Sequence, residues 1–150
     1  MSGVVVATAW AAAAINAAAG IWGAWRWWRV ELSAAFWVLL RAGQAATVVF
    51  AVVCGIAAIG GHTPDDGLFW LYVALPIAVA FVAEQLRILS AQSVLEARGL
   101  PDAQAVGRLD DAGQRSVVLA IVRREMGVMT AEALAVAFLL GRAALTSGGI

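Results

Sequence analysis

The sequence contains no lysine, one histidine and one cysteine. Without lysine, enzymes that form a Schiff base or use a lysine nucleophile are excluded. Cys54 has no second cysteine with which to form an intrachain disulfide or a redox-active dithiol. His62 alone cannot supply the two axial ligands of a bis-histidine haem. We therefore expect no cofactor, and no metal site.

Motifs that hold phosphates, dinucleotides or catalytic zinc are missing as well. Ser90, Ser93 and Thr130 have no histidine to activate them for nucleophilic attack. We therefore expect that the protein is not an enzyme. The one catalytic alternative is a lipid-modifying enzyme in which Glu84 or Glu132 acts as acid or base.

Charge is scarce and balanced. Charged residues make up 13% of the chain, and ten arginines offset ten acidic residues. This balance argues against nucleic acid as a partner, and the low charge argues against disorder. The chain is 63% hydrophobic with a mean hydropathy of +0.86, which is typical of a membrane protein. The abundance of alanine and the use of arginine in place of lysine indicate a bacterial genome rich in G and C.

Four apolar segments are long enough to cross a bilayer, which requires about 20 residues. They predict an all-α fold, a polytopic four-transmembrane-helix bundle, that forms a single transmembrane domain over residues 1–150. The predicted helices cover residues 4–28, 32–60, 68–98 and 112–146. A short link joins the first two, a turn-rich loop follows at residues 60–67, and a longer polar loop lies at residues 99–113.

The arginines predict an orientation, because positively charged residues gather on the cytoplasmic side of a membrane. Two connections carry a predicted cytoplasmic basic cluster: Arg26, Arg29, Arg98, Arg108, Arg115, Arg123 and Arg124. The opposite side carries only Arg142. We therefore expect a multi-pass protein of the bacterial cytoplasmic (inner) membrane with both termini outside. No positive charge precedes the first segment, so we expect this segment to be kept as a helix rather than cleaved as a signal peptide.

Small residues recur along the first helix at spacings of three and four. They are Ala9, Ala13, Asn16, Ala17, Gly20 and Ala24. Small residues let helices approach closely in lipid, where there is no hydrophobic drive for helix association. We expect this face, with Asn16 in its middle, to be buried against other helices.

Charged residues also lie inside the predicted spans. Each costs at least about 2.5–3.5 kcal/mol at the centre of a bilayer, so such residues are expected to be paired or to line a cavity. With a rise of about 1.5 Å per residue, Arg41, Glu84 and Glu132 fall at similar depths. Arg87 lies one turn from Glu84, and Gln44 one turn from Arg41. These five residues, with Asn16, form a predicted intramembrane polar layer.

This layer leaves two functional hypotheses open, of which we expect the first; the second is its alternative. A neutral network that fixes helix register favours a non-catalytic subunit or scaffold of a membrane complex. Two carboxylates at one depth favour instead a small oligomeric transporter or channel. The expected partners are the lipid bilayer and either a second copy of the chain or another membrane protein.

Overall fold

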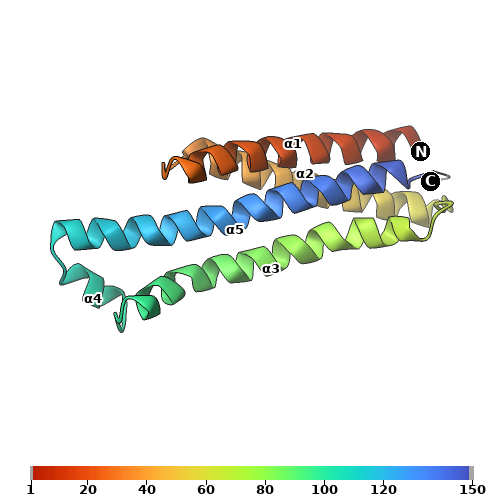
Figure 1. The fold of residues 1–150 in the computed structure, drawn as a ribbon. Coiled ribbons are helices and arrows are strands. Elements are labelled where there is room, and N and C mark those ends of the chain that lie inside the picture. The colour runs from red at the N-terminus through yellow and green to blue at the C-terminus, as the bar shows by residue number, and fades with distance from the viewer. Residues whose placement is uncertain (1, 149–150) are drawn as a thin grey trace.

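The computed structural model describes residues 2–148, and these confirm the all-helical prediction. Four long helices are α1 (Ser2–Trp28), α2 (Ala34–Ile59), α3 (Leu68–Ala97) and α5 (Asp111–Leu145). Each is long and apolar enough to cross a membrane. A short helix, α4 (Ala103–Gly107), lies between α3 and α5 (Figure 1).

The long helices begin and end within two residues of their predicted bounds, and two of these ends have capping side chains. The second helix begins at Ala34 rather than residue 32, because the Ser33 hydroxyl accepts a hydrogen bond from the Phe36 amide. The Asp110 carboxylate caps α5 in the same way, with 2.9 Å to the Gly113 amide. Local sequence signals therefore fix these ends.

The polar loop predicted at residues 99–113 contains α4, which the sequence analysis missed. Gly99 ends α3 with a positive φ of 66°, a conformation that glycine adopts without strain. Asp102 then caps the new helix by accepting a hydrogen bond from the Ala105 amide at 2.8 Å. Helix α4 has only about one turn, which is too short to show a hydrophobic periodicity in the sequence.

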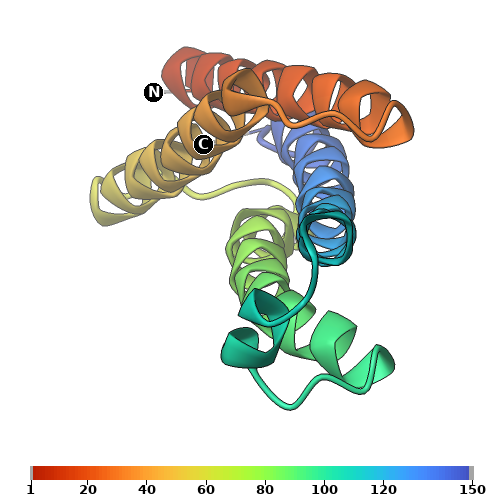
Figure 2. The same cartoon turned by 90° about the vertical axis from the view of Figure 1, so that its left-hand side faces the viewer.

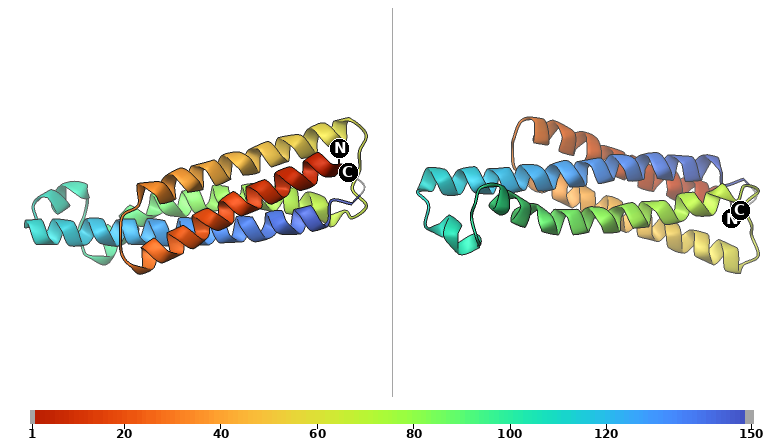
Figure 3. Two further views of the ribbon diagram at one scale, coloured as in Figure 1. Left: turned by 90° about the horizontal axis from the view of Figure 1, so that it is seen from above. Right: turned by 60° about the horizontal axis from the view of Figure 1, so that its bottom comes forward.

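The helices pack in the spatial order α2, α1, α5, α3. Helix α5 packs along both α1 and α3, and α2 packs along α1. In contrast, α2 and α3 make few backbone contacts and splay apart (Figure 2). The described ends of the chain lie near the α2–α3 connection, whereas the α1–α2 link and α4 lie at the other end (Figures 1 and 3).

The buried face of α1 differs in part from the predicted one. Ala9, Ala13, Asn16 and Gly20 are buried, but Ala17 and Ala24 are partly exposed. The buried positions follow a seven-residue repeat instead: Val5, Ala9, Ala12, Asn16, Ala19 and Gly23. The face is shifted because α1 packs between two helices, α2 and α5, rather than against one.

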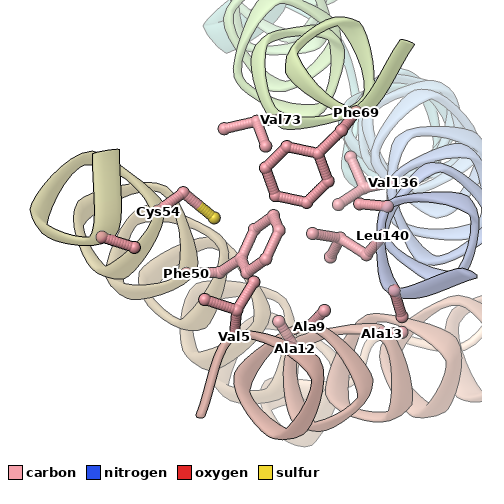
Figure 4. Close-up of a cluster of buried hydrophobic side chains, with 13 residues drawn as sticks. Val5, Ala9, Ala12, Ala13, Phe50, Cys54, Phe69, Val73, Val136 and Leu140 are labelled. Atoms are coloured by element: carbon pink, nitrogen blue, oxygen red, sulfur yellow. The ribbon is translucent and has the colours of Figure 1, made fainter. Parts of the chain in front are cut away.

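Large side chains fill the end of the bundle near the α2–α3 loop. Phe50 of α2 and Phe69 of α3 meet edge to face, with 6.5 Å between ring centroids (Figure 4). Val73 and Leu140 pack beside them. This cluster joins α2 to α3 at that end, and the two helices separate beyond it.

Helices α3 and α5 extend past the ends of α1 and α2 (Figure 3). Trp27, in the last turn of α1, lies against Gly127 of α5, and Arg123 stacks on the Trp27 ring. Residues 111–122 of α5 therefore continue about 18 Å beyond α1. This arm carries α4 at its tip.

We predict that Gly43→Ala destabilises the bundle. A Cβ at residue 43 would lie 2.7 Å from the Asn16 Oδ1 atom, so the buried Asn16 side chain would have to leave its hydrogen bonds or α1 and α2 would have to separate. Overpacking of this kind costs about 1–3 kcal/mol. The expected result is a lower midpoint of thermal unfolding in detergent, measured by circular dichroism.

Gly55→Ala in the same helix is the matched control. Nothing lies within 4 Å of a Cβ at Gly55, and alanine favours a helix over glycine by about 1 kcal/mol. The midpoint should therefore stay the same or rise. Equal destabilisation by both substitutions would contradict the proposed close contact.

Candidate functional site

The structure brings five of the six predicted layer residues together into one network, which we call the polar network (Arg41, Gln44, Glu84, Arg87 and Glu132). Arg41 on α2 donates from Nη1 to the Glu84 Oε1 atom on α3 at 2.6 Å. The same Nη1 donates to Gln44 Oε1 at 2.6 Å. The network therefore bridges α2 and α3 at a level where their backbones are far apart.

Glu84 is the centre of this network. Its second oxygen, Oε2, accepts from the Arg87 Nε atom at 3.0 Å, one turn along α3. The Arg87 guanidinium also stacks on Trp37 of α2, at 5.5 Å from the ring centroid. One carboxylate thus pairs with two guanidiniums, and this triad has a net charge of +1.

Glu132 on α5 has a different environment. Its side chain is almost fully buried, with 3% of the residue exposed. Oε1 accepts a 3.3 Å hydrogen bond from Gln44 Nε2, and Oε2 has no hydrogen-bond partner among the described residues. Within that part of the chain, no arginine lies in salt-bridge distance of Glu132. Glu132 is therefore linked to the triad only by its hydrogen bond with Gln44.

Gln44 is the junction between the two carboxylates. Its amide nitrogen donates to both Glu84 Oε1 and Glu132 Oε1, at 3.2 and 3.3 Å. Its amide oxygen accepts from Arg41. Only this orientation of the amide places a donor toward each carboxylate and an acceptor toward the guanidinium.

Asn16 does not join this network. Its Nδ2 atom lies within hydrogen-bonding distance of the Ala12 and Gly43 carbonyls and the Thr47 hydroxyl, at 2.9, 3.1 and 3.2 Å. The side chain is fully buried at the contact of α1 with α2. Asn16 therefore joins two helices, as an interhelical hydrogen-bonding group does.

The polar network lies on the open side of the bundle, between the splayed helices. The Arg41 side chain is 52% exposed there, compared with 25% for Glu84. A groove of about 260 Å³ runs from the network toward the Phe50–Phe69 contact. We call it the α2–α3 groove; its walls are Gln44, Thr47, Val48, Ile77, Ala80, Phe81, Glu84, Glu132 and Val136.

Glu132 also lines a second groove, on the other side of the α3–α5 contact. This groove measures about 520 Å³, and its other walls are alanine, valine and leucine residues. Glu132 is therefore the one residue that both grooves share.

The predicted basic cluster gathers at the end of the molecule that carries α4. Arg26 and Arg29 both pair with Glu31 in the α1–α2 link. Arg98 donates to the Ser116 hydroxyl at 2.9 Å, and Arg123 covers Trp27. Arg108 and Arg115 lie exposed on the arm, and Arg124 lies exposed on α5 just outside it. At the opposite end, Arg142 stacks on Tyr72.

Two residues at the site were missed from the sequence. Thr47 lines the groove and contacts Asn16, and Trp37 covers Arg87. Both lie about one turn from a predicted member, Thr47 from Gln44 and Trp37 from Arg41. Extending the layer by one turn along α2 would have found them.

The site combines charged and polar side chains with an apolar surface. It presents guanidinium and carboxylate groups, an amide and one hydroxyl beside an apolar groove. No cluster of three or more histidine, cysteine or acidic residues suited to a metal occurs in the part that the structure describes. The arrangement can therefore hold an ion or a polar group at the end of an apolar cavity.

Comparisons with protein-family models, curated proteins and solved structures found no match to this chain.

We predict energetic coupling between Arg41 and Glu84. Arg41→Met and Glu84→Leu should each destabilise the fold, because the first removes one of the two cations paired with Glu84 and the second leaves Arg41 and Arg87 without their carboxylate. The double variant should recover about 0.5–3 kcal/mol relative to the sum of the two. Unfolding free energies of the four proteins in detergent measure this coupling. Additive effects would show that the bridge does not hold α2 to α3.

Proposed function

We propose that the chain is an integral protein of the bacterial cytoplasmic membrane with both termini outside. Four apolar helices support insertion. Support for the orientation comes from the arginines, seven of which lie at the end that carries α4 or on the arm, against Arg142 at the other end. In this orientation the arm of α3, α4 and α5 projects into the cytoplasm.

Cysteine labelling tests this topology. Cys54→Ala removes the only cysteine, and Thr63→Cys or Gln104→Cys then places one thiol in the α2–α3 loop or in α4. A membrane-impermeant maleimide added to intact spheroplasts should label residue 63 and not residue 104. After lysis it should label both. Labelling of residue 104 alone in spheroplasts would reverse the proposed orientation.

We further propose that the protein acts as a small oligomeric transporter or channel. One observation carries this proposal: the polar network lies on the open side of the bundle, where Arg41 is half exposed. A network that only stabilises the fold would be most stable when buried inside the bundle, because ionic groups exposed to hydrocarbon raise the free energy. Polar groups facing outward within predicted spans instead favour a wet pathway or a ligand site.

Four helices enclose little space by themselves, so we propose that more than one copy forms the pathway. The open sides of neighbouring copies would face one another across it, each contributing its Arg41, Gln44 and Glu84. Direct contact between these sides is disfavoured, because both Glu84 oxygens already accept bonds and half-exposed arginines would meet. A hydrated space between copies avoids this repulsion.

Flux in proteoliposomes tests the transport proposal. Proton movement is read with entrapped pyranine, and rubidium and chloride movement with radiolabels. We expect flux of at least one of these ions above that of protein-free vesicles. Glu84→Gln should reduce the flux at least tenfold, because it removes the charge that holds Arg41 and Arg87.

Glu96→Gln, a carboxylate change in the last turn of α3 outside the network, is the control and should leave flux unchanged. The absence of flux for all three ions would contradict the proposal. Flux that is the same in the wild-type and Glu84→Gln proteins would contradict it as well.

The second candidate is a non-catalytic subunit or scaffold. The observation that favours it is the pairing itself, since Arg41, Glu84 and Arg87 satisfy one another and tie α2 to α3. Under this function a different membrane protein would cover the open side. Its stoichiometric co-purification from native membranes in mild detergent, together with no flux by the isolated chain, would favour the scaffold.

A further inference from the structure

We propose that the α2–α3 groove is a binding site for a small organic ammonium ion with an apolar body, and that the Glu132 carboxylate is its anchor. This inference names a substrate class for the proposed transporter. It rests on that function for transport, but binding alone can be measured without it.

Glu132 is an acceptor without a donor. Its Oε2 atom is buried and has no partner among residues 2–148, and its Oε1 receives only the long bond from Gln44. A buried, unpaired carboxylate is costly, and a positively charged donor relieves that cost. Both guanidiniums of the network donate to Glu84, so neither of them donates to Glu132.

An ammonium group fits this position better than an anion does. An N–H donor on a cation would form a charge-assisted hydrogen bond with Oε2. Thr47 and Gln44 also line the groove, and the side-chain oxygen of each can accept a further hydrogen bond from an ammonium group. An anion placed there would instead meet the carboxylates of both Glu84 and Glu132.

The rest of the groove selects an apolar body. Val48, Ile77, Ala80 and Val136 form its walls, and the Phe81 ring offers a face for a cation or an aromatic group. Its volume of about 260 Å³ is below the roughly 300–1,000 Å³ of typical ligand sites. The ligand is therefore small, with one aromatic ring or a short alkyl chain.

Isothermal titration of the protein in nanodiscs tests the site, with 2-phenylethylammonium as the probe. Two probes of similar shape are the controls: 2-phenylethanol, which is neutral, and phenylacetate, which is an anion. We expect the ammonium probe to bind at least tenfold more tightly than either. Glu132→Gln should weaken its binding at least tenfold, and Glu96→Gln should not.

Ala80→Phe provides a second test that leaves Glu132 in place. It should weaken binding by filling the groove, whereas Ala74→Phe, at an exposed position on α3 outside both grooves, should not. Circular dichroism and gel filtration of each variant confirm that it is folded.

Three results would overturn the site: no binding of the ammonium probe at millimolar concentration, equal binding by the alcohol or phenylacetate, or unchanged binding in Glu132→Gln. The ion-flux assay separates this inference from the proposed function. Flux that depends on Glu84 without ammonium binding would reject the site alone. Ammonium binding that depends on Glu132, in a protein that moves neither these three ions nor radiolabelled 2-phenylethylammonium into proteoliposomes, would support the site and reject the transporter.

Discussion

The bridge between Arg41 and Glu84 joins two helices, α2 and α3, whose backbones make few contacts. Helices α2 and α3 meet through Phe50 and Phe69 near their shared loop and then diverge. Long side chains span the resulting gap, with 2.6 Å between Arg41 Nη1 and Glu84 Oε1. A short polar bridge at one end and an aromatic contact at the other leave a groove between them. The site depends on this geometry, because closer helices would leave no groove.

The splayed arrangement follows from how α1 and α5 are built. Helix α1 presents alanine and glycine to both neighbours, so α2 and α5 can each approach it closely. Gly43 on α2 leaves room for the Asn16 side chain, which then bonds across the contact. Helix α5 holds α3 on its other side. With α2 attached to α1 and α3 attached to α5, the backbones of α2 and α3 make few contacts beyond the end that their loop joins.

The two carboxylates of the polar network, Glu84 and Glu132, have different surroundings. Glu84 accepts from two arginines and has no free oxygen, whereas Glu132 is more deeply buried and keeps an oxygen without a partner. Gln44 links them and keeps a polar path between the paired and the unpaired group. Glu84 is therefore fully engaged in the bridge between α2 and α3, whereas Glu132 keeps one oxygen that could accept a further donor.

The amino-acid sequence by itself determined the four long helices, their ends, and which charges lie at similar depth. These properties are local: apolar length, capping residues such as Ser33 and Asp110, and a constant rise per residue. Only the tertiary structure decided that Glu84 takes both arginines, that Asn16 stands apart, and that the network faces an open side. Depth along a helix follows from residue number, but the direction in which a side chain points depends on which helices pack together. That choice also shifted the buried face of α1, because a helix with two neighbours buries a broader set of residues than its smallest side chains indicate.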